Sequence, residues 1–177
     1  TIMKVAIIGA GSLGQSIAKG LLKNKVVSSL YLTKRNTDSI TKFKDFSEVI
    51  LTSNNEEAVK NSDILIFSVQ PGQFEDILNQ IKSKLNDKHV IISTITGFKI
   101  NRIEKITGAS IPIIRAMPNT AISVGKSMTC ICSNEKGVKS APVAEALFNG
   151  LGTTIKIEES LMQAATVICA SGIAFWM

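Results

Sequence analysis

The sequence predicts an α/β fold: a Rossmann-type, doubly wound and mainly parallel sheet with two extra strands, followed by the start of an all-helical C-terminal domain. Two observations predict it. Short runs rich in Val and Ile alternate with longer amphipathic stretches, as in stacked β-α-β units. A glycine-rich turn at residues 9–14 also joins the first apolar run to the first amphipathic stretch, which is how such sheets begin.

The first two thirds of the chain supply the parallel sheet. Residues 4–8 are an apolar first strand, and residues 12–22 have the spacing of an amphipathic helix. Residues 63–69 are nearly all apolar, as a central strand buried on both faces should be. Pro71 suits the first turn of a helix, because its missing N–H has no helical partner there. The remaining expected elements are strands at 30–33, 48–51, 90–95 and 111–114, and helices at 55–60 and from 71 to about 85.

The last third of the chain does not continue this regular alternation of strands and helices. Two extra strands are expected at 127–132 and 153–157, with a helix over 139–149 between them. A last helix begins near residue 158 and is apolar on most faces, so we expect it to continue into further chain or to dock against another subunit. We therefore expect a Rossmann domain over 1–157 and, over 158–177, the first helix of a separate part of the protein.

Composition narrows the function classes. The 20 Lys and Arg exceed the 14 Asp and Glu and give a net charge of +6, but they are scattered rather than interleaved with aromatic residues, so no nucleic-acid partner is expected. No Cys-x-x-Cys pair occurs, so no metal site is expected. Cys130 and Cys132 alternate in a strand as small hydrophobic residues and fit a reduced, cytoplasmic compartment. The apolar end at 161–177 is shorter than the ~20 residues of a membrane span and contains Gln163, so we expect a buried helix there and no membrane partner.

The glycine-rich turn predicts a phosphate site. Gly9 allows a tight turn, Gly11 a close approach of backbone to a pyrophosphate, and Gly14 close packing of helix on strand. The N-terminus of the helix then directs free N–H groups and the positive end of its dipole at the phosphates. The expected ligands in this turn are Gly9, Ala10, Gly11, Ser12, Leu13 and Gly14.

The residues at the end of the second strand indicate which dinucleotide binds. An NAD site usually has an acidic residue about 20 residues after the glycines, where it accepts hydrogen bonds from the ribose 2′-hydroxyl. Here the strand ends in Thr33, Lys34, Arg35 and Asn36, which can neutralise a 2′-phosphate. We therefore predict NADP as the cofactor. The alternative is that Lys34 and Arg35 are solvated surface charges.

Other strand ends are expected to line the same ligand, because ligands of open α/β sheets lie outside the carboxyl ends of the strands. Asn119 and Thr120 supply polar groups where the nicotinamide should lie. Each loop is equally consistent with ordinary turn chemistry, and His89 and Asp63 are more consistent with structural positions than with acid or base roles. The further candidate ligands are Asn55, Ser68, Val69, Gln70, Pro71, Ile95, Thr96, Gly97, Pro118 and Asn119.

Four spaced segments carry a resemblance to one family. These are Arg115-Ala116-Met117-Pro118-Asn119-Thr120 with Val124-Gly125 and Met128-Thr129, then Asn55-x-Glu57-Ala58-Val59, then Ser68-Val69-Gln70-Pro71-Gly72-Gln73, and Ala170-Ser171-Gly172-Ile173-Ala174-Phe175. In order and spacing the sequence resembles the pyrroline-5-carboxylate reductases of proline biosynthesis. The resemblance implies NADPH-dependent reduction of a cyclic imine, 1-pyrroline-5-carboxylate, to L-proline. It also implies that residues 1–157 are an NADP-binding Rossmann domain and that 158–177 are the first helix of a truncated helical dimerisation or substrate domain. The C-terminal helices would form a homodimer or higher homo-oligomer.

The sequence departs from that family at a few positions. Gln70 stands where the family usually has Lys, Ala121 where it has Pro, and the last motif differs at Ala170, Ile173 and Phe175. The family's substrate-contacting Gly- and Thr-rich segment lies beyond the last residue of this chain, so catalytic residues are not assigned and activity is expected of the longer protein rather than of this fragment alone. Two alternatives stay open: a related NADP-dependent reductase acting on another small substrate, and a non-catalytic dinucleotide-binding module.

Overall fold

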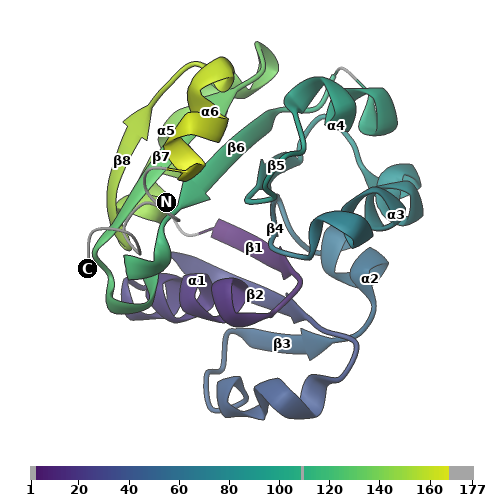
Figure 1. Cartoon of the computed structure of the whole chain (residues 1–177). Coiled ribbons are helices and arrows are strands. Elements are labelled where there is room, and N and C mark those ends of the chain that lie inside the picture. Colours follow the sequence, from purple (N-terminus) through teal and green to yellow (C-terminus); the bar gives the residue numbers. More distant parts are fainter. Residues whose placement is uncertain (1–2, 109, 168–177) are drawn as a thin grey trace.

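The computed structural model describes residues 3–108 and 110–167. Its centre is an eight-stranded sheet in the order β3-β2-β1-β4-β5-β6-β7-β8 (Figure 1). The strands from β1 to β6 run parallel, β7 is antiparallel to β6, and β8 is parallel to β7. The first six strands thus have the 3-2-1-4-5-6 order of a Rossmann fold, and β7 and β8 are the two extra strands, as predicted. The strands are β1 (Met3–Ile8), β2 (Val27–Thr33), β3 (Val49–Thr52), β4 (Ile64–Phe67), β5 (Val90–Ser93), β6 (Ile113–Pro118), β7 (Ser127–Ser133) and β8 (Gly152–Lys156).

Helices cover both faces of the sheet, and each face has its own core. On one face α1 (Ser12–Lys23), α5 (Ala141–Asn149) and the 3₁₀ segments η1 (Thr37–Phe43) and η3 (Thr120–Val124) bury apolar side chains against the sheet. On the other face lie α2 (Asn55–Lys60), α3 (Pro71–Ile81) and α4 (Ile100–Thr107), which Figure 1 shows grouped together. Successive residues of a strand point to opposite faces, so both cores draw on the same strands.

The end of the described chain adds a third, smaller core. After η4 (Lys136–Ser140), α5 and β8, the 3₁₀ segment η5 (Glu159–Leu161) leads into α6 (Met162–Thr166). Met162 is fully buried there against Met117 and Cys130. Figure 1 shows α6 lying beside the β6–β8 end of the sheet. The segment after β8 is therefore packed on the far end of the Rossmann sheet.

The structure corrects several predicted boundaries. The second strand begins three residues earlier than predicted, at Val27, and the sixth extends to Pro118 instead of ending at 114. The helix predicted from 71 to about 85 ends at Ile81 and is followed by the 3₁₀ segment η2 (Lys82–Lys84). Helix α4 was not predicted, and neither was η1. Of the last predicted helix, the structure describes the part up to residue 167, and the motif at 170–175 lies outside the described residues.

Candidate cofactor cleft and active site

The glycine turn is fixed by hydrogen bonds from both neighbouring strands. Gly9 has φ +96°, a conformation that side chains disfavour. Its N–H donates to Oγ1 of Thr33 at 3.2 Å, and its carbonyl accepts from Oγ of Ser68 at 2.6 Å. A Cβ on Gly14 would lie 2.5 Å from the Gly9 carbonyl oxygen and 2.6 Å from Ser68 Oγ. The turn role of Gly9 and the packing role of Gly14 are therefore confirmed.

Gly11 differs from the other two glycines because a Cβ there would meet no atom within 4 Å. Gly11 is the N-cap of α1, and no side chain caps that helix end. Helix geometry leaves the first amides of α1, those of Ser12, Leu13 and Gly14, without partners inside the helix. Open space thus adjoins donors at the positive end of a helix dipole, and this suits the phosphates of a dinucleotide.

A cleft of about 690 Å³ opens between β1, β2 and β4, where the strand order reverses. It brings together most of the predicted ligands near the turn: Gly9, Ala10, Gly11, Thr33, Lys34, Arg35, Asn36, Asn55, Ser68, Val69 and Gln70. The residues that the sequence analysis missed are Ser53, Gln73, Asp76, Ile77 and Gln80. The last four have helical spacing along α3, so they share one face of that helix. That spacing, after the loop at the switch point, is the signal that could have found them.

The basic end of β2 lies in this cleft. Lys34 is half-buried, and Arg35 and Asn36 are exposed. Within the described ranges neither Lys34 nor Arg35 forms a salt bridge. The nearby acid, Asp38, does not line the cleft, and its amide N–H donates to Oδ1 of Asn36. Two cationic side chains therefore face the cleft without a protein carboxylate as partner in the described residues, which suits an added phosphate.

The opposite wall carries the amide side chains of Asn55, Gln73 and Gln80, together with the acidic Asp76 and the apolar Ile77. Nδ2 of Asn55, at the start of α2, is 3.4 Å from Oε1 of Gln80 on α3. Thr33 lines the cleft as predicted, but its hydroxyl and carbonyl oxygens accept from the amides of Gly9 and Ala10. Thr33 therefore holds the glycine turn in place.

Nine of the predicted ligands do not line the cleft. Three lie in the first turn of α1, and Pro71 opens α3. The others follow β5 and β6 at the same edge of the sheet. Thr96 and Gly97 are exposed, and Oγ1 of Thr96 is 3.8 Å from Sδ of Met117. Oδ1 of Asn119 accepts from the amide of Ala121 and caps η3, whose first residue is the exposed Thr120. The nine are Ser12, Leu13, Gly14, Pro71, Ile95, Thr96, Gly97, Pro118 and Asn119.

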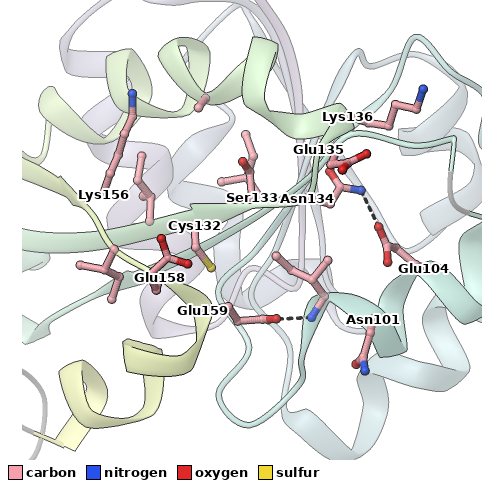
Figure 2. Close-up of a pocket in the computed structure, with 15 residues that line it drawn as sticks. Asn101, Glu104, Cys132, Ser133, Asn134, Glu135, Lys136, Lys156, Glu158 and Glu159 are labelled. Carbon is pink, nitrogen blue, oxygen red and sulfur yellow. Dashed lines mark hydrogen bonds between the residues drawn. The ribbon is translucent and has the colours of Figure 1, made fainter.

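A second cavity of about 820 Å³ lies near the start of β6 and the ends of β7 and β8 (Figure 2). Because β7 runs against β6, these strand ends lie at the sheet edge opposite the glycine turn, whereas another part of the wall is the start of α4, which follows β5. Its wall mixes carboxylates, lysines and amides, among them Glu104, Asn134, Lys156 and Glu159. Cys132 also lines it, and burial together with the nearby Glu159 carboxylate raises the pKa of that thiol to about 11. Of the two cavities, the smaller cleft is the one that has the strand-end position typical of Rossmann ligands.

The remaining candidates have structural roles. His89 is buried, its Nδ1 accepts from the amide of Asn86, and its Nε2 lies 3.2 Å from the carbonyl oxygen of Val59. Cys130 and Cys132 both face the small core around Met117, as predicted. Among the described residues no group of His, Cys, Asp and Glu is arranged to hold a metal ion. No described helix has the length and apolarity needed to cross a membrane.

Comparison with known proteins agrees with this geometry. The sequence profile of the family described as NADP oxidoreductase, coenzyme F420-dependent, matches residues 4–97. The chain is 40% identical to pyrroline-5-carboxylate reductase 1 of Dictyostelium discoideum, over 97% of this chain and 34% of that protein. It is 31% identical to the pyrroline-5-carboxylate reductase of Schizosaccharomyces pombe, over 96% of this chain and 67% of that protein.

Solved structures give the same result. The Plasmodium falciparum pyrroline carboxylate reductase with NADP bound superposes with a TM-score of 0.85 at 27% identity, over 98% of this chain and 64% of that one. The Coxiella burnetii pyrroline-5-carboxylate reductase gives a TM-score of 0.92 at 27% identity, over 99% and 67%. The chain spans 34% and 63% of the two Dictyostelium discoideum reductases that it matches. With similarity along nearly its whole length to these proteins, and with a glycine turn and cleft at the switch point of its sheet, the chain belongs to the pyrroline-5-carboxylate reductase family.

Proposed function

We propose that this chain supplies the NADPH-binding part of a reductase that converts 1-pyrroline-5-carboxylate to L-proline. The observation that carries the proposal is the cleft at the switch point, where an open glycine turn and the unpaired cations Lys34 and Arg35 line one cavity in the described part of the chain. A relative of known structure, from Plasmodium falciparum, has NADP bound. Membership of the family is the reason for proposing the imine as the substrate.

Each part of the cleft has a role in the proposed binding mode. The glycine turn and the first amides of α1 receive the pyrophosphate, because Gly11 leaves the space that a side chain would fill. Lys34 and Arg35 pair with the 2′-phosphate by charge-assisted hydrogen bonds. The polar face of α3, with Gln73 and Gln80, lines the adenosine side. The nicotinamide end then extends toward the loops after β5 and β6, as in other doubly wound sheets.

The proposed reaction places modest demands on the protein. When bound, NADPH supplies a hydride, with its electron pair, to the C=N carbon of the imine. The ring nitrogen of a protonated imine needs no further proton to become the amine of proline. The protein therefore mainly has to orient the imine and exclude water. Asn119 and Thr120 lie at the carboxyl end of β6, where they can shape the face of hydride transfer.

The proposal includes the organisation of the longer protein. We place the domain boundary after residue 157, with the helical part completing the substrate site and forming a homodimer or larger homo-oligomer in the cytoplasm. Leu161 and Val167 support this because both are apolar and more than half exposed, at 54% and 57%, beside the buried Met162 of α6. Exposed apolar side chains at the start of the helical part suit a surface that further chain or a second subunit covers. Limited proteolysis near residue 157 and sedimentation of the full-length protein test these two points.

Two measurements test the function. Calorimetry on this chain should give tighter binding of NADPH than of NADH, and equal or reversed affinities would remove the argument from Lys34 and Arg35. Protein from the complete reading frame should oxidise NADPH with 1-pyrroline-5-carboxylate and form proline. NADPH binding without any turnover would favour the alternatives, a reductase for another small imine or a dinucleotide-binding module.

A further inference from the structure

One carboxylate oxygen joins three separate elements of the fold. Oε1 of Glu159, the first residue of η5, accepts a hydrogen bond from Nη1 of Arg115 in β6 at 3.1 Å. The same oxygen accepts from the backbone N–H of Ile100, the first residue of α4, at 2.8 Å. Figure 2 shows the Glu159 side chain extending to this helix end. We refer to Glu159, Arg115 and the Ile100 amide as the clasp.

The clasp is shielded from water on its cationic side. The Arg115 side chain is 5% exposed and that of Glu159 is 30% exposed. The buried guanidinium of Arg115 has lost its water and therefore depends on the Glu159 carboxylate as its charged partner. Glu159 also supplies what α4 lacks locally, since no side chain near its N-cap residue Lys99 caps that helix. Glu159 thus fixes the segment after β8 both to the sheet, through Arg115, and to α4, through the Ile100 amide.

The clasp adjoins the loops that the proposed reaction uses. Two residues after Arg115 along β6 comes Met117, whose sulfur lies 3.8 Å from Oγ1 of Thr96. Met117 also packs against Met162 of α6. The loop that carries Thr96 and Gly97 leads directly into the clasped end of α4. Three elements therefore meet at the clasp: the middle of β6, the start of α4 just after the β5 loop, and the start of the helical part.

We propose that Glu159 is a positioning residue, which holds the nicotinamide-side loops and the helical part in the relative placement that hydride transfer needs. This rests on the proposed reductase function. Hydride transfer depends steeply on geometry, and a displacement of about 1 Å can cost ~100-fold in rate. The cofactor cleft lies at β1, β2 and β4, so a change at the clasp affects the transfer step and leaves dinucleotide affinity unchanged.

The test compares variants of the full-length enzyme. Glu159→Ala should lower kcat at least about tenfold while the Kd for NADPH stays within about twofold. The isotope effect with NADPH deuterated at the transferred position should rise, because the transfer step then limits turnover. Glu159→Gln keeps an oxygen that can accept from Ile100 and Arg115, so it should restore most of kcat. If Glu159→Ala does not fold, Glu159→Asp carries the test, since it keeps the charge but is one methylene too short to reach both donors.

Glu145→Ala is the matched control, because it breaks an ion pair between Glu145 of α5 and Lys156 of β8 but touches none of the three clasped elements. It should leave kcat and the isotope effect unchanged. The proposal is overturned if folded Glu159→Ala or Glu159→Asp enzyme keeps wild-type kcat, or if Glu145→Ala lowers kcat as much. Hydrogen exchange at the Ile100 amide requires no substrate. Faster exchange of this amide in Glu159→Ala would support the clasp. If the wild-type enzyme then shows no turnover on 1-pyrroline-5-carboxylate, the function is wrongly assigned and the clasp is not. Unchanged exchange would exclude the clasp.

Discussion

The hydroxyl of Ser68 donates a 2.6 Å hydrogen bond to the carbonyl oxygen of Gly9, across the point where the strand order of the sheet reverses. Gly9 follows β1, and Ser68 follows β4, its neighbour in the sheet. The bond fixes the glycine turn against the adjacent strand end, with Gly14 packed below both atoms. The floor of the cleft is therefore fixed by the backbone and by two hydroxyl groups, those of Ser68 and Thr33.

Gly11→Ala and Gly14→Ala should separate binding from folding. In Gly11→Ala the added Cβ meets open space, so we expect the free energy of unfolding to change by less than about 1 kcal/mol. The methyl group nevertheless occupies the approach to the pyrophosphate, and the Kd for NADPH should rise by about tenfold or more, ~1.4 kcal/mol. Calorimetry and denaturant unfolding measure the two effects. Wild-type affinity in Gly11→Ala would place the pyrophosphate elsewhere.

Gly14→Ala should instead destabilise the fold. Its Cβ would overlap the Gly9 carbonyl oxygen and Ser68 Oγ, at 2.5 and 2.6 Å, and overpacking of this kind costs about 1–3 kcal/mol. Since neither neighbour is the free end of a long side chain, the turn itself must shift. Urea unfolding of Gly14→Ala beside Gly11→Ala gives the comparison. Equal midpoints for the two variants would contradict this account of the turn.

The double variant Lys34→Ala/Arg35→Ala should abolish the preference for the 2′-phosphate. Hydrogen bonds to charged groups contribute about 1.5–3 kcal/mol, so NADPH should bind at least about tenfold more weakly while NADH is unaffected. Lys19→Ala/Lys23→Ala removes the same charge from exposed positions on α1 and serves as control. Titration of all three proteins with both dinucleotides distinguishes a local site from general electrostatic attraction, for which the two double variants would lose NADPH affinity equally.

Phe74→Ala should be among the most destabilising core substitutions. Phe74 is fully buried between Phe67 and Phe98, with ring centroids 5.2 and 4.8 Å away. Its removal leaves a cavity between α3, β4 and the loop before α4, and changes of this type cost about 3–5 kcal/mol. Phe46, which is 42% exposed, is the control, and Phe46→Ala should cost less than about 1 kcal/mol. Chemical denaturation measures both.

Cys132 should make stability depend on alkaline pH. Burial, with a further contribution from the Glu159 carboxylate, raises its pKa from 9.0 to about 11. The folded state thus binds the thiol proton more tightly than the unfolded state does. The resulting stability is complete below about pH 9 and is lost as the pH rises from 9 to 11. Unfolding curves of wild type and Cys132→Ala should converge or cross over that interval, because only the wild type loses this contribution.

The same thiol reports on the clasp. Because the thiolate is the reactive form, iodoacetamide should modify Cys132 slowly at neutral pH, as followed by peptide mass spectrometry. Removing the Glu159 charge in Glu159→Gln should lower the pKa of Cys132 and speed its modification. Glu145→Gln should not. An unchanged rate in Glu159→Gln would mean that burial alone sets the pKa.

The local sequence pattern was enough to predict a residue's role wherever that role depends on its neighbours in the chain. The glycine turn, the basic end of β2 and the apolar strand at β4 were all predicted correctly, since each rests on backbone conformation or on alternation within a few residues. The α3 face of the cleft was missed because its residues reach the cleft only through the tertiary position of α3. Their spacing on one helix face was present in the sequence, but nothing local directs that face to the cleft.

Helix α4 shows where the sequence alone is insufficient. Its N-terminus carries no capping side chain nearby, so the usual start signal is absent. The cap comes from Glu159, 59 residues further along the chain. The sequence by itself determined the sheet, the glycine turn and the basic residues at the end of β2, because neighbouring residues encode them. Only the tertiary structure decided which carboxylate stabilises α4 and Arg115, because a buried charge takes its partner from whatever the fold brings within reach.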